Sequence, residues 1–292
     1  MRKYLLLLFC GALLLSSCRN TRDHIVIGSK NFTEQVIIAE MIAQHVESKL
    51  NIKVERRFYL GGSYIAHQAL LAGRIDIYPE YTGTALTAIL KLPVQSGNAT
   101  EVRNVVKREY ARRFQVEVAP ALGFNNTFAM IIRGEDARKS GIQTLSDAAK
   151  FTPQWRAGVG YEFLERPDGF KGLVATYGLQ FREMPRVMDL GLLYRALKDK
   201  QVDIVAGNST DGLIAALDCL VLQDDKHYFP PYEAVPLVRQ DSLSRFPGLE
   251  AALHDLEDKI SDDEMRRLNY AIDGEHRDVK VVASEFLKSK GL

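Results

Sequence analysis

His24-Ile25-Val26-Ile27-Gly28 is a short β-branched run that ends at a glycine, and it predicts a buried strand. Residues 31–48 then have apolar side chains at helical spacing, and Asn31 and Glu34 have the spacing of a capping box. Strands that alternate with helices indicate a parallel sheet covered on both faces, with ligands at the carboxyl ends of its strands. The following elements of this alternating series are expected to be a strand at 52–58, a helix at 63–72 and a strand at 75–78.

A second alternating series predicts another α/β unit, in which we expect strands at 128–132, 156–159 and 202–206 and helices at 167–177 and 190–198. Residues 228–236 contain too many prolines for a helix, and the remainder is helical again. We therefore predict an α/β protein with two lobes, which are lobe 1, residues 24–125 and 229–292, and lobe 2, residues 126–228. The chain would cross between them at 123–127 and 227–232, and these crossings would form a two-stranded hinge about which the lobes close on a ligand.

The first residues have the layout of a secretory signal, with basic Arg2 and Lys3 before a short apolar run and small residues. Leu15-Ser16-Ser17-Cys18 resembles a bacterial lipobox, in which the cysteine becomes the new N-terminus and carries a lipid. This predicts a lipoprotein signal peptide at 1–17, lipidation of Cys18 and a polar tether at 18–23. An ordinary signal peptide that ends near a cysteine is the alternative.

Charge and cysteine content exclude several classes of protein. The chain has 38 basic and 37 acidic residues, and removal of Arg2 and Lys3 leaves one net negative charge without a basic patch, so no nucleic-acid partner is expected. Cys10 is lost with the signal and Cys18 is acylated, so Cys219 stands alone and no disulfide is expected. A single cysteine in an apolar run is typical of a small buried side chain.

Enzyme motifs are absent from the sequence. The six histidines lack metalloprotease spacing, no nucleophile elbow or phosphate-binding loop occurs, and Gly158-Val159-Gly160 is too short for a dinucleotide site. We therefore expect no catalytic residue, no metal and no cofactor.

Six motifs carry a resemblance to a known family. The chain resembles the substrate-binding proteins of the glycine betaine, choline and carnitine (osmoprotectant) ABC importers, of the OpuAC/ProX type, over nearly all of its length after the signal. The motifs lie at residues 28–35, 75–84, 122–128, 163–169, 209–212 and 224–232. The resemblance implies a periplasmic-binding-protein fold of type II, a monomer that faces the periplasm or exterior, and the permease and ATPase of an importer as partners.

The resemblance also implies an aromatic cage for a quaternary ammonium group. Such a group has no N–H to donate, and aromatic faces hold it at about 0.5–2 kcal/mol each. The family builds its cage from four tyrosines, and the motifs match them to Tyr81, Phe128, Asn208 and Tyr232. Phe128 keeps an aromatic face, whereas Asn208 replaces one wall by an amide. We expect weaker binding of glycine betaine, or a ligand with a polar group at that wall.

The carboxylate of a betaine needs hydrogen-bond donors, and by motif position these are Lys30, Thr84 and Arg166. Arginine offers a bidentate fork, and Lys30 lies where a strand gives way to a helix. Two cations aimed at the cleft would favour a zwitterion over choline.

Each of these residues also has an ordinary structural interpretation, as a half-buried tyrosine or a solvated surface charge. Asp211 is expected to be the N-cap of a helix at 212–217, and Thr33 and Glu34 are expected to cap a helix rather than contact a ligand. Carnitine, choline and ergothioneine remain alternative ligands. A sensory lipoprotein that uses the same clamp remains an alternative function.

Overall fold

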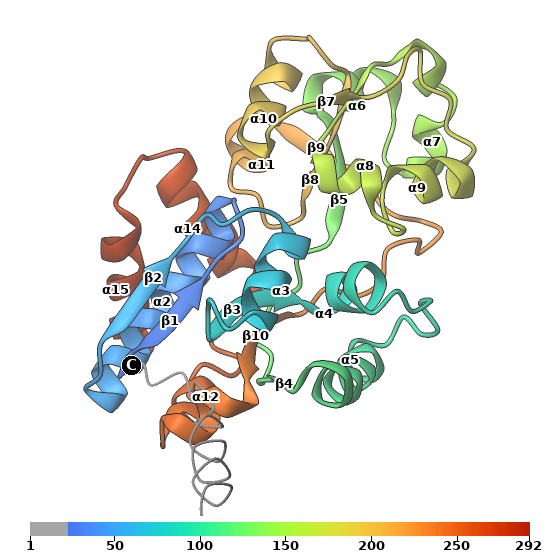
Figure 1. Ribbon diagram of the computed structural model, residues 1–292. Coiled ribbons are helices and arrows are strands. Elements are labelled where there is room, and N and C mark those ends of the chain that lie inside the picture. Colours follow the sequence, from blue (N-terminus) through green and yellow to red (C-terminus); the bar gives the residue numbers. More distant parts are fainter. Residues whose placement is uncertain (1–22) are drawn as a thin grey trace, which may run out of the picture.

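The computed structural model describes residues 23–292, which form two α/β lobes (Figure 1). The strands of lobe 1 are β1 (Ile25–Gly28), β2 (Val54–Arg57), β3 (Ile77–Tyr81), β4 (Val116–Val118) and β10 (Ala234–Arg239). They form one sheet in the order β2-β1-β3-β10-β4. β1 is parallel to β2 and β3, whereas β10 is antiparallel to β3 and β4. The signal peptide expected at 1–17, and Cys18 with it, lies outside the described residues.

Lobe 2 contains the second sheet. Its strands are β5 (Phe128–Arg133), β6 (Ala157–Val159), β7 (Arg186–Val187), β8 (Ile204–Asn208) and β9 (Cys219–Val221), in the order β7-β6-β8-β5-β9. β6 is parallel to β7 and β8, and β5 is antiparallel to β8 and β9. The expected parallel sheets are therefore mixed. The first strand after each crossing, β5 or β10, starts at the edge where the neighbouring parallel strand ends, so it must run the opposite way.

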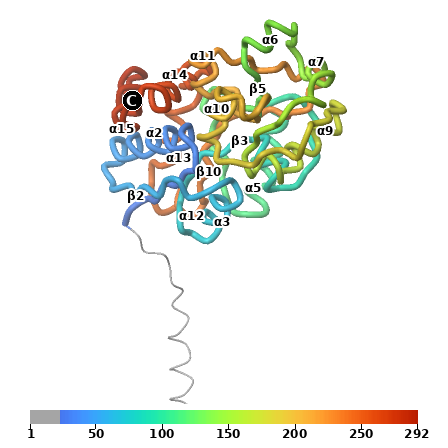
Figure 2. The backbone as a smooth tube through the Cα atoms, turned by 90° about the horizontal axis from the view of Figure 1, so that it is seen from above, coloured from blue at the N-terminus to red at the C-terminus, as the bar shows by residue number. Residues whose placement is uncertain are grey.

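Helices cover both faces of each sheet, as the alternating series predicted. Lobe 1 has α2 (Thr33–Leu50), α3 (Ser63–Leu71), α4 (Thr82–Thr84), the π-helix η1 (Ala85–Ile89), α5 (Ala99–Phe114), α12 (Gln240–Arg245), α13 (Leu249–His254), α14 (Asp262–Asp273) and α15 (Val279–Ser289). Lobe 2 has α6 (Gly134–Ser140), α7 (Leu145–Ala148), the 3-10 helix η2 (Thr152–Gln154), α8 (Tyr161–Glu165), α9 (Phe170–Tyr177), α10 (Leu190–Lys198) and α11 (Leu213–Ala216). The C-terminal α14 and α15 lie beside α2 near the start of the fold (Figure 2).

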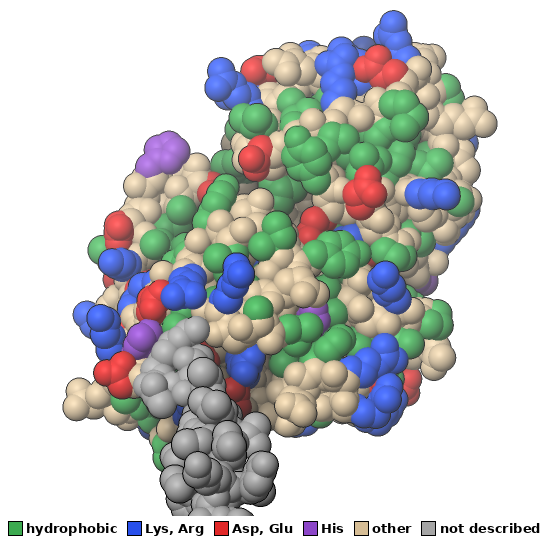
Figure 3. All heavy atoms as spheres, viewed as in Figure 1, with side chains coloured by type: hydrophobic (Ala, Val, Ile, Leu, Met, Phe, Trp, Pro, Cys, Tyr) green, Lys and Arg blue, Asp and Glu red, His purple; other side chains and the backbone are tan. Residues whose placement is uncertain are grey.

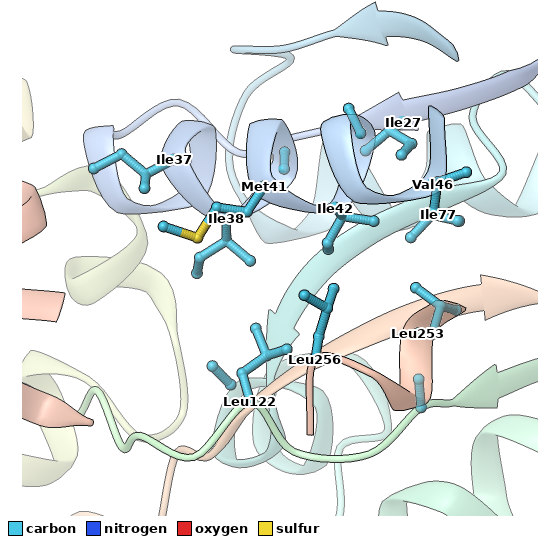
Figure 4. Close-up of a cluster of buried hydrophobic side chains, with 14 of the residues drawn as sticks. Ile27, Ile37, Ile38, Met41, Ile42, Val46, Ile77, Leu122, Leu253 and Leu256 are labelled. Carbon is cyan, nitrogen blue, oxygen red and sulfur yellow. The ribbon is translucent and has the colours of Figure 1, made fainter. Parts of the chain in front are cut away.

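Each sheet has a hydrophobic cluster on both faces. On β1, Ile25 and Ile27 pack into the cluster under α2 and the C-terminal helices, whereas Val26 packs into the cluster under α3 and α5. Figure 4 shows Ile27 in the first of these clusters, near Ile42 and Val46 of α2. On β8, Ile204 and Val205 divide in the same way between the two clusters of lobe 2. This alternation explains why the strand sequences are continuous apolar runs, since both faces are buried.

The two segments that cross between the lobes lie side by side. The backbone N–H of Asn126 donates to the carbonyl of Tyr232 at 3.0 Å, and Asn125 and Glu233 form an isolated antiparallel bridge. The side-chain oxygen of Asn125 also accepts from the N–H of Tyr232 at 2.6 Å. The hinge expected at 123–127 and 227–232 is therefore a short two-stranded element.

Two capping predictions are wrong. α2 begins at Thr33 with Phe32 as its N-cap and no side-chain cap, because the Glu34 side chain is buried in contacts with other elements. α11 has Gly212 as its N-cap, and Asp211 instead accepts hydrogen bonds from the Tyr194 hydroxyl and the Asn208 backbone. Each acid has the spacing of a cap but accepts hydrogen bonds from residues outside the helix that it was expected to cap.

Candidate ligand-binding cleft

The edges of the two sheets that face each other collect the candidate site residues. Lys30 follows the end of β1, Tyr81 ends β3 and Asn208 ends β8. Phe128 begins β5 directly opposite Asn208, and Ala234 begins β10 opposite Tyr81. Strands of opposite direction thus bring their carboxyl and amino ends to one cleft, in agreement with the rule for ligand sites in α/β sheets.

A cavity of about 330 Å³ lies between the lobes and contacts all seven residues proposed from the sequence. On the face shown in Figure 3, hydrophobic side chains gather along the boundary between the lobes. The predicted residues that line the cavity are Lys30, Tyr81, Thr84, Phe128, Arg166, Asn208 and Tyr232. The cavity has a size suited to a small molecule.

Aromatic rings form much of the cavity wall. The rings of Phe128 and Tyr232 meet edge to face with centroids 6.0 Å apart. Phe32 stacks near Tyr81, with centroids 6.4 Å apart, and also lines the cavity. The ring centroid of Phe163 lies 4.8 Å from that of Phe128, and Phe163 also lines the cavity. Sequence matching missed Phe32 and Phe163, although both lie within the quoted motifs, because only the four tyrosine positions of the family were considered.

Lys30 is buried, with 2 % of its surface exposed, and is already paired. Its Nζ donates to Glu80 Oε1 at 2.5 Å and to Ser63 Oγ at 3.4 Å. The same ammonium lies 4.6 Å from the ring centroid of Tyr81. Glu80 therefore neutralises the cation that was expected to meet a ligand carboxylate, and Lys30 stacks on one of the rings proposed for the cage.

Arg166 has a carboxylate partner as well. Its guanidinium donates to both oxygens of Asp168, at 2.9 and 2.5 Å, and to Thr84 Oγ1 at 3.0 Å. It also lies 4.6 Å from the ring centroid of Phe128. A guanidinium has more N–H groups than these three bonds use, so Arg166 retains donors for a ligand.

Asp168 links this pair to the aromatic wall, because it also accepts from the Tyr232 hydroxyl. Burial acts to raise the pKa of Asp168, but the hydrogen bonds and charge of Arg166 outweigh it and lower the pKa. Burial raises the pKa of Tyr232 well above its ordinary value, and the Asp168 charge adds to this. Asp168 is thus ionised and Tyr232 neutral across the neutral pH range. The excess positive charge expected from the sequence is balanced by carboxylates.

Glu34 is a buried acid at the junction of the lobes. Its carboxylate accepts from Tyr81 Oη at 2.6 Å and Asn126 Nδ2 at 2.7 Å. It also accepts from Thr210 Oγ1 of lobe 2 at 2.5 Å and Asn269 Nδ2 of α14 at 2.8 Å. Burial raises the pKa of Glu34, and these four donors only partly oppose it. Through its hydrogen bond with the Tyr81 hydroxyl, Glu34 fixes the position of the Tyr81 ring.

Asn208 is half-buried at the wall where a fourth aromatic ring was expected. Its Nδ2 donates to Asp211 Oδ1 at 3.3 Å, and its backbone N–H donates to Asp211 Oδ2 at 2.8 Å. The Tyr194 hydroxyl donates to Asp211 Oδ2 at 2.7 Å. Burial raises the pKa of Asp211 to about 6, and the nearby Glu34 charge contributes to this shift.

The described residues also bear on the predictions about metal binding, membrane-spanning helices and free cysteines. Between residues 23 and 292, no cluster of three or more histidine, cysteine or acidic side chains is arranged to hold a metal ion. Over the same range no helix has the length and apolar character to span a bilayer. Cys219 is a half-buried free thiol on β9 rather than a core residue, because that strand lies at the edge of its sheet.

Two α/β lobes joined by paired crossings, with a ligand-sized cavity between them, define the class of type II periplasmic binding proteins. The family model "Substrate binding domain of ABC-type glycine betaine transport system" matches residues 23–289. The chain belongs to this family, whose members are extracytoplasmic binding proteins of transporters and not enzymes. The protein is therefore a substrate-binding protein of a betaine/carnitine-type ABC importer.

Individual relatives differ in the ligand that they are named for. The chain is 35 % identical to the carnitine transport binding protein OpuCC of Listeria monocytogenes, over 97 % of this chain and 94 % of the relative. It is 36 % identical to the ergothioneine transport permease/ergothioneine binding protein EgtU of Helicobacter pylori, over 99 % of this chain and about half (52 %) of that longer protein. A crystal structure described as a glycine betaine/carnitine/choline ABC transporter matches 91 % of this chain and 98 % of its own, with a TM-score of 0.76 and 36 % identity.

Proposed function

We propose that this protein captures a small quaternary-ammonium zwitterion, such as glycine betaine, in the cleft between its lobes and delivers it to the permease and ATPase of the importer. Closure of lobe 2 on lobe 1 buries the ligand, and opening at the permease releases it unchanged. The seven residues proposed from the sequence serve as the ligand contacts. Tyr81, Phe128 and Tyr232 act through their rings, Lys30, Thr84 and Arg166 act as donors to a carboxylate, and Asn208 acts through its amide. Phe32 and Phe163 add aromatic surface.

The observation that carries this proposal is the placement of aromatic rings next to neutralised cations. Lys30 and Arg166 each lie 4.6 Å from a ring centroid, so these faces already attract cations in the protein itself. Because Glu80 and Asp168 balance both charges, a ligand that is itself neutral overall enters without leaving a net charge buried. A zwitterion with a methylated cationic end satisfies both conditions.

Isothermal titration calorimetry with two matched ligands tests the proposal. Glycine betaine and tert-butylacetate have the same shape and carboxylate, but only the first carries a positive charge in its methylated head. Three rings at about 0.5–2 kcal/mol each predict that glycine betaine binds at least ten-fold more tightly. Equal affinities, or no binding of glycine betaine, carnitine or choline at millimolar concentration, would refute the cage.

A second candidate ligand is a betaine that bears a polar ring, such as ergothioneine. Asn208 favours it, because the amide offers hydrogen bonds where an aromatic wall would only exclude water. A thermal-shift ranking of glycine betaine, carnitine, choline and ergothioneine separates the candidates, since the tightest ligand produces the largest increase in Tm at equal concentration.

We also propose that Cys18 carries a lipid that anchors the monomeric protein to a membrane, facing the periplasm or exterior. The lipobox sequence at residues 15–18 supports this proposal. Cys18→Ser expressed in a bacterial host should move the protein from the membrane fraction to the soluble fraction. An unchanged membrane fraction would refute the anchor.

A further inference from the structure

A second cavity adjoins the cleft on the far side of Asn208. It has a volume of about 210 Å³ and is called the annex here. The cleft and the annex share a wall, whose residues are Asn31, Phe32, Leu190, Gly207 and Asn208. Asn208 stands where a fourth cage ring was expected, so the wall between the two cavities is formed there by an amide instead of a larger ring.

The lining of the annex differs from that of the cleft in its charge. The annex is lined by the carboxylates of Glu34, Asp211 and Asp273, and no lysine or arginine between residues 23 and 292 lines it. The cleft, in contrast, is lined by Lys30 and Arg166. An anionic lining attracts groups that donate hydrogen bonds or carry positive charge.

Two acceptors of the annex have capacity to spare. Asp211 Oδ1 accepts only a long bond from Asn208 at 3.3 Å. Asn269, which is 2 % exposed, donates through Nδ2 to Glu34 and Thr210, while its Oδ1 has no hydrogen-bond partner among the described residues. A buried acceptor without a partner loses free energy that a donor from a ligand or water restores.

Apolar groups complete the annex. Phe32, Leu193 and Leu213 line it, and Tyr59, 63 % exposed, lies at its rim. Thr33 donates to Asp273 Oδ1 at 2.6 Å, whereas Asp211 contacts Asn208, a residue of the wall that the annex shares with the cleft. The combination of apolar walls with acceptors suits a flat ring that carries N–H groups.

We propose that the annex is a subsite for an N–H-bearing arm of the same ligand, so the physiological ligand is a betaine with a heterocyclic or similar donor arm on the carbon between its ammonium and carboxylate groups. This inference rests on the proposed function, because the cage and the donors of the cleft hold the betaine part. The arm passes Asn208 and donates to Asp211. Glycine betaine lacks such an arm and leaves the annex to water.

Gly191 provides a variant that fills the annex without disturbing the cleft. It lies in α10, lines the annex and not the cleft, and a Cβ at its position meets no atom within 4 Å. Gly191→Phe should therefore fold. Gly97→Phe is the matched control, since Gly97 also has open space and lines a different cavity. Asp211→Asn removes the acceptor charge and keeps the shape.

Calorimetry on the protein without its signal peptide uses glycine betaine and histidine betaine, which differ by an imidazole arm. We expect histidine betaine to bind at least ten-fold more tightly than glycine betaine, because its arm adds a hydrogen bond to a charged group. Gly191→Phe and Asp211→Asn should each weaken histidine betaine about ten-fold, while glycine betaine changes less than two-fold and Gly97→Phe changes neither.

The outcomes separate this inference from the proposed function. If glycine betaine binds and the imidazole arm brings no gain, the annex is not a subsite, although the cage stands. If Gly191→Phe leaves the affinity for histidine betaine unchanged, the arm does not enter the annex and the inference fails. If neither betaine binds to the folded protein, both the inference and the proposed function fail.

Discussion

Replacement of Asn208 by tyrosine tests the cage and its open wall together. Among the described residues, the side chain of Asn208 makes one hydrogen bond, the 3.3 Å contact to Asp211 Oδ1, and its backbone N–H keeps the 2.8 Å bond to Asp211 in any variant. Loss of the long contact costs little. Asn208→Tyr adds one aromatic face to the cleft, which provides about 0.5–2 kcal/mol for a quaternary ammonium group. The expected gain in glycine betaine affinity is therefore about two- to thirty-fold.

The same variant should have the opposite effect on a larger ligand. A tyrosine at the wall between the cleft and the annex obstructs the passage, so histidine betaine loses the advantage of its arm. Isothermal titration calorimetry of both ligands measures the two changes. Asn208→Leu is the matched control, because it fills similar space without an aromatic face. A folded Asn208→Tyr protein that binds glycine betaine no better than Asn208→Leu does would refute the assignment of this wall.

Three further substitutions test two buried carboxylates, those of Glu34 and Asp168, and the half-buried carboxylate of Glu162. Glu34→Gln leaves the Asn269 amide with the Thr210 carbonyl as its one good acceptor among the described residues and should lower the free energy of unfolding in urea by about 1–3 kcal/mol, whereas exposed Glu250→Gln should change it by less than 0.5 kcal/mol, roughly the surface average. Folding raises the pKa of Glu34 above its ordinary 4.5, so the stabilisation from its protonated form is complete below pH 4.5 and declines as pH rises through the folded pKa. The difference in unfolding free energy between wild type and Glu34→Gln should therefore shrink as pH rises. A difference that grows with pH would contradict the raised pKa. Asp168→Asn leaves Arg166 buried without its counter-ion and should destabilise the protein by about 3–5 kcal/mol, seen as a lower Tm. Because the folded pKa of Asp168 is lowered, its contribution is present above pH 3.8 and is lost as pH falls through the folded value, and a Tm difference that persists in strong acid would argue against the pairing. Glu162 Oε1 of lobe 2 accepts from the Ser63 N–H of lobe 1 at 2.5 Å, and Glu162→Gln weakens this contact between the lobes. The variant should bind glycine betaine about three- to ten-fold more weakly with little change in stability, and X-ray scattering should show a more open average form. Unchanged scattering and affinity would exclude this contact as a determinant of closure.

Much of the fold could be predicted from local patterns. The runs at 24–28 and 128–132 are apolar because both faces of each sheet are buried, and the predicted strands there correspond to β1 and β5. Helix α10 occupies the residues expected for it. The antiparallel strand in each sheet was not predicted, because strand direction depends on where the chain re-enters a lobe and leaves no mark on the periodicity.

The sequence predicted the aromatic residues that line the cavity and missed the buried acids beside them. A family motif identifies Tyr81 and Tyr232 as a pair, but Glu34 has the spacing of a helix cap, and its burial depends on Asn126, Thr210 and Asn269, which are distant in sequence. Only the assembled lobes reveal that it is inaccessible to solvent. Acidic residues that fall within ligand-binding motifs without an exposed role are the signal that could have identified it.

The paired crossings make Tyr232 a mechanical part of the protein as well as a wall of its cavity. Its backbone is fixed to Asn125 and Asn126 in the hinge, while its hydroxyl reaches Asp168 on the opposite lobe. Any rotation at the hinge moves the ring relative to Asp168 and Arg166. In the proposed transport cycle, opening would therefore separate the walls of the cavity, and a permease that draws the lobes apart would lower the affinity for the ligand without a separate signal.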